Sequence, residues 1–234
     1  MNQFEVGLEE PGLDVDVSDI SDAIDDQSGF WGINGGAKRT ADIIISLCAL
    51  VFLAPLMLLV YAAIKMDGGS GFYVQSRVGR GGKLFRMCKF RSMLPDAEAV
   101  LQYLLETDPQ ARAEWNHFQK LRRDPRITRV GRILRASSID ELPQLINVLK
   151  GDMSIVGQRP ILPHQRDAYG IHIAGYEQAR PGITGLWQVK GRNRLSFEQR
   201  ASLGSEYVRR WSLGLDLWII LLTIPALIFS AGAY

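Results

Sequence analysis

The chain has 234 residues, enough for one domain of ordinary size with a substantial core. Its net charge of +2 hides an uneven distribution: residues 1–37 hold nine acidic and no basic residues, which leaves 27 basic against 16 acidic, or +11, for the remainder. Such a basic body favours an anionic partner: nucleic acid, lipid headgroups or a nucleotide-sugar pyrophosphate. We find no zinc-finger, helix-turn-helix or RNA-binding signature, so we expect no nucleic acid partner. The two cysteines form no C-x-x-C pair, which fits a reducing compartment.

The start of the chain is the acidic part. Residues 1–30 contain glycine and serine, lack hydrophobic periodicity, and begin without the basic and apolar regions of a signal peptide. We predict that residues 1–35 form a disordered cytosolic tail, which could dock on a partner or on the basic body.

An apolar segment follows at residues 36–66. Residues 43–64 are 22 positions without formal charge, enough to span a hydrocarbon core of roughly 30 Å as a straight helix. Pro55, near the centre, removes a backbone hydrogen bond and bends a helix. Basic residues flank both ends, so the positive-inside rule assigns both flanks to the cytoplasm. We predict a re-entrant membrane helix broken at Pro55; a proline-kinked single span is the alternative.

Residues 72–93 are predicted to form a β-hairpin, with residues 72–74 in one strand, 79–82 in the turn and 84–90 in the partner strand. The hairpin has no acidic residue, and its basic residues are Arg77, Arg80, Lys83, Arg86, Lys89 and Arg91. One interpretation is a solvated face, or a contact with anionic headgroups worth about 1 kcal/mol per basic residue.

Residues 95–122 alternate apolar and charged positions at helical spacing, with an interruption at Asp108 and Pro109. We predict two amphipathic helices whose apolar sides contact the core or a membrane surface.

Two adjacent carboxylates, Asp140 and Glu141, follow a basic stretch. The preceding arginines recur at a spacing of three: Arg126, Arg129, Arg132 and Arg135. This spacing places four guanidinium groups near one face of a helix or helical turn, with the carboxylates just beyond its end. Acidic pairs are mostly solvated surface features, but cations beside carboxylates also suit a phosphate-bearing substrate.

Local rules restrict where a helix begins near these carboxylates. Ser138 and Glu141 fit the S-x-x-E capping box, but Pro143 would then be the fifth helical residue, whose N–H should be paired. A helix that starts at Asp140 or later accommodates Pro143, and the carboxylates then lie at the positive end of that helix.

The C-terminal third contains turns and two helices. Residues 157–160 and 181–185 have the composition of turns. Ser196 and Gln199 form a capping box that predicts a helix through about Arg210. Residues 217–229 are 13 apolar positions, about 20 Å as a helix and too short to span a membrane. With Trp218 among them, we predict an interfacial helix.

Three ordered motifs carry a family resemblance. They are residues 140–144 (DELPQ), 147–160 (NVLKGDMSIVGQRP) and 181–189 (PGITGLWQV) followed by 191–193 (GRN). On these residues the chain resembles the monotopic bacterial sugar transferases, polyprenyl-phosphate phosphoglycosyl transferases that start surface polysaccharides. It is most similar to the exopolysaccharide-initiating undecaprenyl-phosphate galactose or glucose phosphotransferases. The resemblance covers about residues 36–234 and departs from the family at Gln158, where proline is usual, and at Ala54, where serine often precedes the proline.

The resemblance implies an α/β fold that is mostly helical with a small β-hairpin. It implies a monotopic protein at the bacterial inner (cytoplasmic) membrane, with a re-entrant helix, interfacial amphipathic helices and a cytosolic catalytic domain over residues 67–234. The implied reaction moves hexose 1-phosphate from a UDP-sugar, galactose or glucose favoured, to undecaprenyl phosphate and releases UMP. A homodimer or a polysaccharide-assembly partner is compatible with it.

The resemblance also implies residue roles. Asp140 is the expected nucleophile, which forms an aspartyl phosphosugar, and Glu141 is the expected ligand of Mg²⁺. The basic residues expected to bind the donor or lipid phosphates are Lys89, Arg135, Arg159 and Arg192.

Two other functions compete with this one. A non-catalytic membrane-surface protein could bind nucleotide sugars or anionic lipid and recruit an assembly complex, although such an anchor has no need for two carboxylates among arginines. A nucleotide-sugar pyrophosphatase would release free sugar phosphate without the lipid.

Overall fold

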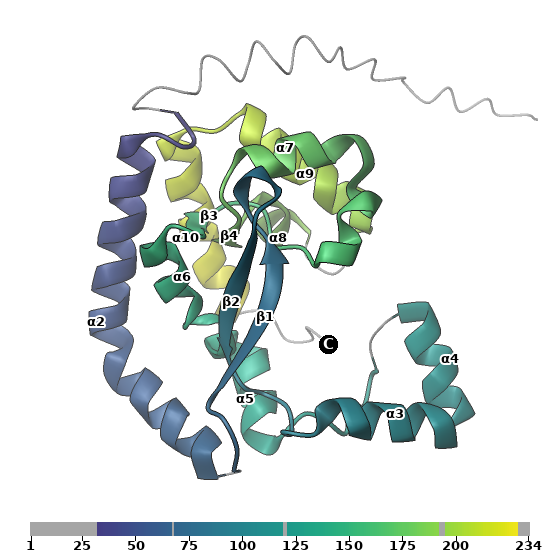
Figure 1. Cartoon of the computed structure of the whole chain (residues 1–234). Coiled ribbons are helices and arrows are strands. Elements are labelled where there is room, and N and C mark those ends of the chain that lie inside the picture. The colour runs from purple at the N-terminus through teal and green to yellow at the C-terminus, as the bar shows by residue number, and fades with distance from the viewer. Residues whose placement is uncertain (1–31, 67, 119–120, 192–194, 229–234) are drawn as a thin grey trace, which may run out of the picture.

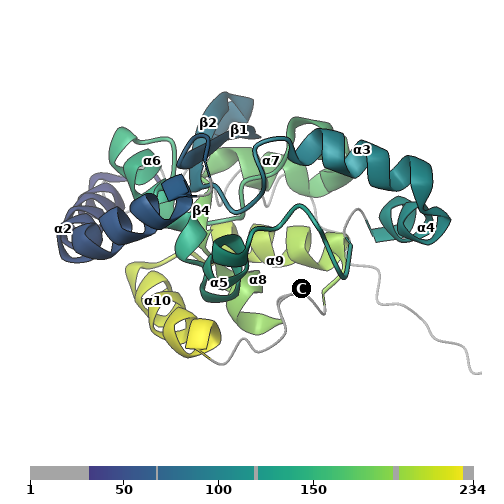
Figure 2. The ribbon, with the colours of Figure 1, turned by 90° about the horizontal axis from the view of Figure 1, so that it is seen from below.

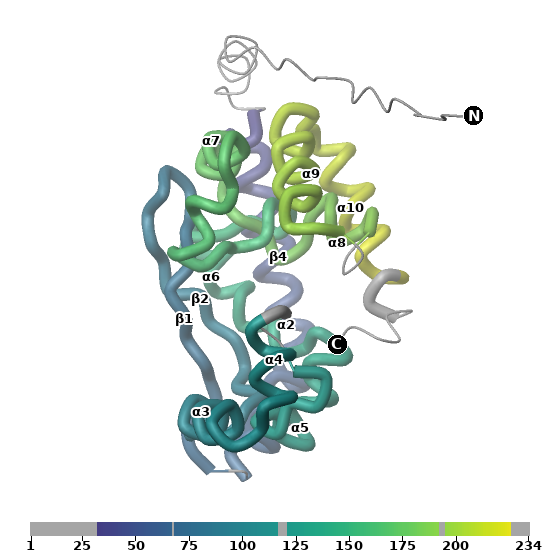
Figure 3. The backbone as a smooth tube through the Cα atoms, turned by 90° about the vertical axis from the view of Figure 1, so that its right-hand side faces the viewer, coloured from purple at the N-terminus to yellow at the C-terminus, as the bar shows by residue number. Residues whose placement is uncertain are grey.

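The computed structural model describes residues 32–66, 68–118, 121–191 and 195–228. Within these ranges the chain is mostly helical and contains the small β-hairpin, as predicted for the fold class, and it has a second two-stranded sheet that was not predicted. Figure 1 shows helix α2 along one edge, the β1–β2 hairpin across the front and the C-terminal helices behind it. At one end of the molecule Figure 3 shows α7 (Ile173–Gln178), α8 (Leu186–Lys190), α9 (Phe197–Arg209) and α10 (Leu213–Ile228). At the other end it shows α3 (Ala97–Thr107), α4 (Pro109–Phe118) and α5 (Arg129–Ser137), with the hairpin running between the two groups.

Helix α2 (Gly36–Met66) is the one described helix that is long and apolar enough to cross a membrane. It is continuous through Pro55, and Figure 1 shows that it changes direction toward its C-terminal end. An interior proline supplies a physical cause for such a bend, because it removes one backbone hydrogen bond. Re-entry into the membrane at this residue stays a prediction.

The N-terminal half of α2 packs on the body through polar residues. Lys38, Asp42 and Ser46 are buried and recur every four residues, so they share one side of the helix. The Asp42 carboxylate accepts hydrogen bonds from the Ser154 hydroxyl at 3.0 Å and the Ile155 amide at 2.9 Å. The polar side of α2 therefore packs against the body of the protein.

The folded body begins before the predicted tail boundary at residue 35. Ile33 is only 5% exposed and belongs to the main core, and the Asn34 amide donates to the Gln178 carbonyl at 2.7 Å. Residues 1–31 of the predicted tail lie outside the described residues.

The predicted hairpin is confirmed, with antiparallel strands β1 (Phe72–Val78) and β2 (Leu84–Phe90) joined through a 3₁₀ turn at Arg80–Gly82. Strand β1 continues beyond the predicted residue 74, so it includes Arg77. The register pairs Tyr73 with Lys89 and Arg77 with Phe85. Because side chains alternate along a strand, Arg77 and Lys89 lie on the same face of the hairpin.

Residues 181–185 do not form the turn that their composition suggested, because β4 (Gly182–Thr184) pairs in parallel with β3 (Ser154–Val156). The glycines serve close backbone approach instead. A Cβ at Gly182 would lie 2.1 Å from the Gly157 nitrogen, and one at Gly157 would lie 2.6 Å from the Arg180 carbonyl oxygen. This pairing brings residue 183 beside the loop that follows β3.

The main core lies among α6 (Gln144–Lys150), β3, α9 (Phe197–Arg209) and α10 (Leu213–Ile228). The predicted capping box of α9 is confirmed: the Ser196 hydroxyl accepts from the Gln199 amide, and the Gln199 side chain accepts from the Ser196 amide. Helix α10 inserts Ile219 into the core, while its other side exposes Leu217, Trp218, Leu221 and Ile224.

The two helices predicted between residues 95 and 122 are α3 (Ala97–Thr107) and α4 (Pro109–Phe118). Asp108 separates them, and its carboxylate accepts from the backbone N–H groups of Gln110 and Ala111. No residue of α3 is buried, and Figures 1 and 2 both show the pair extending away from the α2 side of the molecule. The apolar side of α3 is therefore outside the core.

Candidate functional site

The two carboxylates lie in a single 3₁₀ turn, Ile139–Glu141, between α5 (Arg129–Ser137) and α6. Ser138 ends α5 in a left-handed conformation with φ of 57°, and its side chain makes no capping hydrogen bond. The capping box does not form, and α6 begins directly after Pro143, as the proline predicted. Ile139 and Leu142 pack on the cluster around Phe90, which fixes the turn from both sides.

Arg126 does not belong to the predicted helical face of four arginines. Helix α5 starts later, with the Thr128 hydroxyl as N-cap, and Arg126 instead forms two hydrogen bonds with the Asp124 carboxylate at 2.8 and 2.7 Å. Of the three arginines on α5, Arg129 and Arg132 are exposed. Arg135 is partly buried and donates from Nε to the Ser92 hydroxyl at 2.9 Å.

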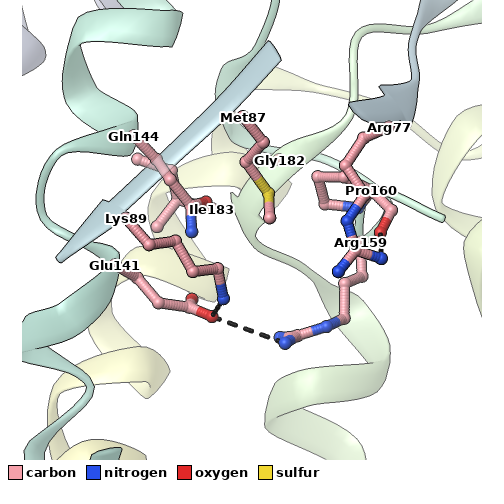
Figure 4. Close-up of a pocket in the computed structure, with 9 residues that line it drawn as sticks. All are labelled: Arg77, Met87, Lys89, Glu141, Gln144, Arg159, Pro160, Gly182 and Ile183. Atoms are coloured by element: carbon pink, nitrogen blue, oxygen red, sulfur yellow. Dashed lines mark hydrogen bonds and ion pairs between the residues drawn. The ribbon is translucent and has the colours of Figure 1, made fainter. Parts of the chain in front are cut away.

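A small cavity opens beside Glu141. Its lining comes from the hairpin, the turn, α6, the loop after β3, and β4: Arg77, Met87, Lys89, Glu141, Gln144, Arg159, Pro160, Gly182 and Ile183 (Figure 4). Glu141 Oε1 accepts from Lys89 Nζ at 2.6 Å and from Arg159 Nη2 at 3.4 Å. The cavity volume of about 10 Å³ is close to what one water molecule needs, so a larger ligand requires side chains to move. Arg159, with its side chain 46% exposed, is better placed to move than Lys89 at 16%.

The adjacent carboxylates have different electrostatic environments. Burial alone would raise the pKa of Glu141, but Arg159 and Lys89 lower it to about 2. For Asp140, burial outweighs the opposing effect of Lys89 and raises the pKa above its ordinary value. Within the described part of the chain, no salt bridge involves Asp140. The Glu141 carboxylate is thus held by Lys89 and Arg159, whereas the Asp140 carboxylate forms no such ion pair with a described residue.

The structure brings most of the predicted site residues together. Lys89, Glu141 and Arg159 line the cavity, and the charges of Lys89, Arg135 and Arg159 act on Asp140. Arg192 lies outside the described residues.

Sequence reasoning missed other residues of the cavity. Arg77 was grouped with the cations beside the membrane, and Gln144, although part of a motif, received no role. A signal for Arg77 existed, because a hairpin register that pairs residue 73 with residue 89 places residues 77 and 89 on one face.

The described residues contain no group of three or more His, Cys, Asp or Glu side chains that could hold a metal ion. A metal at this site would therefore take one or two ligands from the carboxylates at positions 140 and 141. Mg²⁺ is commonly bound in this way, through one or two carboxylates together with substrate phosphates, so the donor set fits it.

Comparison with known proteins gives a family match and several relatives. Residues 33–230 match the family model described as bacterial sugar transferase. The exopolysaccharide production protein ExoY of Sinorhizobium fredii is 45% identical over 203 residues, which are 86% of this chain and 90% of the relative. The undecaprenyl-phosphate galactose phosphotransferase of Salmonella typhimurium is 48% identical over 197 residues, 84% of this chain but only 41% of the relative. The UDP-glucose:undecaprenyl-phosphate glucose-1-phosphate transferase of Caulobacter vibrioides is 41% identical over 206 residues, 84% of this chain and 72% of the relative.

The chain thus spans less than half of the Salmonella protein and most of ExoY. The family match covers the hairpin, the carboxylate turn and the loop that carries Arg159 together. The chain belongs to the bacterial sugar transferase family.

Proposed function

We propose that this protein transfers hexose 1-phosphate from a UDP-sugar, with galactose or glucose favoured, to undecaprenyl phosphate and releases UMP. This reaction would be the first membrane step of exopolysaccharide synthesis. The names of the Salmonella and Caulobacter relatives support the lipid acceptor and the two hexoses, and the name of the Sinorhizobium relative supports the exopolysaccharide product.

The observation that carries the proposal is the difference between the two carboxylates. Glu141 is fixed by Lys89 and Arg159 and stays ionised, which suits a residue that organises charge. Asp140 has no salt bridge to a described residue and a raised pKa, which suits a nucleophile. Neighbouring titratable groups with divergent pKa values commonly divide catalytic roles in this way.

The proposed reaction has two displacements. An oxygen of the Asp140 carboxylate attacks the phosphorus that carries the sugar, the bond from this phosphorus to the UMP oxygen breaks, and UMP leaves with the electron pair. An oxygen of the lipid phosphate then attacks the same phosphorus, and the electron pair of the aspartyl–phosphorus bond returns to Asp140. Neither step needs a net proton transfer.

The basic residues offset the repulsion between an anionic nucleophile and an anionic diphosphate. Lys89, Arg135 and Arg159 surround the carboxylate turn, and we assign them, together with Arg192, to the donor and lipid phosphates. We propose that Glu141 also holds Mg²⁺ jointly with the donor phosphates. When bound there, the ion would supply further positive charge to the diphosphate.

The same proposal places the protein on the cytosolic face of the inner membrane. Helix α2 exposes large apolar side chains along its length, including Phe52 at 84% and Leu59 at 71%, while its buried Lys38 and Asp42 face the body. We propose that α2 re-enters the cytosolic face at Pro55 and that α10 and the α3–α4 pair lie at the headgroup plane. Single cysteines at Gly36 and Ser70, in a background without native cysteines, should both react with an impermeant thiol reagent from the cytosolic side only. Reaction of one site from the opposite side would show a spanning helix instead.

The test of the reaction is intact-protein mass spectrometry without lipid acceptor. The protein in nanodiscs is incubated with Mg²⁺ and UDP-galactose or UDP-glucose, and UMP release is measured in parallel. We expect a sugar-phosphate adduct on the wild type and none on Asp140→Asn. Asp167→Asn makes the same change at an exposed carboxylate outside the cavity and should form the adduct normally.

The alternatives give different results. A binding protein would retain nucleotide sugars without forming an adduct or releasing UMP. A pyrophosphatase would release sugar phosphate in the absence of lipid. Either result would overturn the assignment of Asp140.

A further inference from the structure

Arg77 is the one charged residue of the cavity that neither the sequence motifs nor the proposed function uses. It comes from β1, on the hairpin face that also carries Lys89, and it lines the cavity with Glu141 and Arg159. Figure 4 shows Arg77 beside Pro160, across the cavity from Lys89.

The Arg77 guanidinium is held in place by neutral groups. Its Nη1 donates to the Pro160 carbonyl at 3.2 Å and its Nη2 to the Gln75 side-chain oxygen at 2.7 Å. The Nε donor is buried and has no hydrogen-bond partner among the described residues. A guanidinium that is oriented but not neutralised by a carboxylate of its own is prepared to bind an anion.

The charge balance of the cavity points the same way. Among the described residues, Lys89, Arg159 and Arg77 supply three positive charges to its lining, and Glu141 supplies one negative charge. Burial and the neighbouring Arg159 lower the pKa of Arg77, which shows that the two guanidinium groups act unfavourably on each other. An anion between them would relieve this repulsion.

The cations around the cavity differ in which carboxylate they affect. Lys89 and Arg159 act on both Asp140 and Glu141, Arg135 acts on Asp140, and Arg77 acts on Glu141 more weakly than Arg159 and Lys89 do. The register separates Arg77 from Lys89, because Arg77 pairs with Phe85, four residues and roughly 13 Å along β2 from Lys89. Figure 4 shows Arg77 across the cavity from Lys89 and Glu141, so Arg77 faces the turn that carries Asp140 from the opposite side.

We propose that Arg77 binds the donor phosphate that leaves with the nucleotide. The inference rests on the proposed function, in which Asp140 attacks the sugar-bearing phosphorus. Because attacking and leaving oxygens lie roughly in line across that phosphorus, the phosphate of the departing UMP must lie opposite Asp140, on the side where Arg77 is fixed. As the bond to UMP breaks, the leaving oxygen gains negative charge, which Arg77 stabilises.

The test measures UMP binding by calorimetry and the rate of adduct formation by mass, on the full-length protein in nanodiscs. Loss of a hydrogen bond from a charged group corresponds to about a tenfold or greater loss of affinity. We expect Arg77→Gln to weaken UMP binding at least about tenfold and to slow adduct formation, and Arg77→Lys to be intermediate. Arg80→Gln removes an exposed arginine of the same hairpin outside the cavity and should behave as wild type.

A second comparison separates direct binding from support of the Arg159 loop through Pro160. If Arg77 only positioned Arg159, then Arg77→Gln would cause no further loss of UMP affinity in an Arg159→Gln background. We expect a further loss. Thermal unfolding of each variant shows whether it is folded, and Arg77→Lys provides the readout if Arg77→Gln is not.

The outcomes are distinguishable. A wild type that forms the adduct, with Arg77 variants that bind UMP normally, would overturn this inference and leave the proposed function intact. A wild type that forms no adduct with either donor would overturn the proposed function itself.

Discussion

Replacing Lys38 by methionine tests how α2 is held on the body. Lys38 is 5% exposed, and its ammonium donates to Asp216 at 2.5 Å, to the Val156 carbonyl at 3.0 Å and to the Tyr207 hydroxyl at 3.2 Å. Asp216 is 8% exposed and accepts further hydrogen bonds from Tyr207 and Trp211. Methionine keeps the apolar length of the side chain but leaves the Asp216 charge buried with neutral donors only.

Removing one partner of a buried ion pair costs about 3–5 kcal/mol. At about 2–4 °C per kcal/mol for a chain of this size, the unfolding midpoint of Lys38→Met should fall by about 6–20 °C. Lys65→Met, at an exposed position of the same helix, is the matched control. The double variant Lys38→Met with Asp216→Asn removes both charges and keeps an acceptor for Tyr207, so it should be more stable than either single variant.

The assay is thermal unfolding in nanodiscs, followed by circular dichroism. A midpoint for Lys38→Met within about 2 °C of the Lys65→Met control would show that the ion pair does not hold α2. A double variant less stable than both single variants would show that the uncompensated charge is not the cause of the loss.

Three further predictions concern the site and its supports. Burial raises the pKa of Asp140 above its ordinary value of 3.8, and only the ionised carboxylate attacks. The rate of adduct formation, measured by mass at a series of pH values, should therefore fall on acidification with a midpoint above pH 3.8. A midpoint at or below pH 3.8 would contradict this prediction. The pKa of Glu141 is lowered from 4.5 to about 2, so its ion pairs stabilise the fold fully above pH 4.5 and are lost as pH falls toward 2. The stability difference between wild type and Glu141→Gln, from unfolding midpoints, should shrink over that range and not grow. Gly204→Ala would place a Cβ 2.1 Å from the Gln158 side-chain oxygen and should cost about 1–3 kcal/mol of unfolding free energy. Gly214→Ala, whose nearest contact is 3.8 Å away, should be tolerated. Equal thermal unfolding midpoints for the two variants would refute the packing argument.

Features that depend on neighbouring residues were predictable. The α9 capping box needs only Ser196 and Gln199, three positions apart, and the hairpin needs a glycine turn between two strand-forming segments. Pro143 determined where α6 could start, because its missing N–H is tolerated only near the beginning of a helix. These rules placed Asp140 and Glu141 in a turn before a helix.

Local rules failed where a residue's structure depends on a contact that its sequence pattern does not reveal. The arginine spacing around Arg126 suggested a longer helical face, but Thr128 caps α5 and Asp124 pairs with Arg126. The glycines at residues 182 and 185 suggested a turn, but they allow the backbone around Gly157 to approach. A glycine requirement looks the same in the sequence whether it serves a turn or a close contact.

The sequence by itself determined the hairpin, the start of α6 and the apolar helix, and it singled out Asp140 and Glu141 as candidates. Only the tertiary structure decided that Arg77 belongs to the cavity, that Glu141 is fixed by Lys89 and Arg159, and that Asp140 is not. The reason is that charge effects depend on distance and burial, and these contacts join residues far apart in the chain. Lys89 and Glu141 are 52 positions apart, and Lys38 and Asp216 are 178 apart.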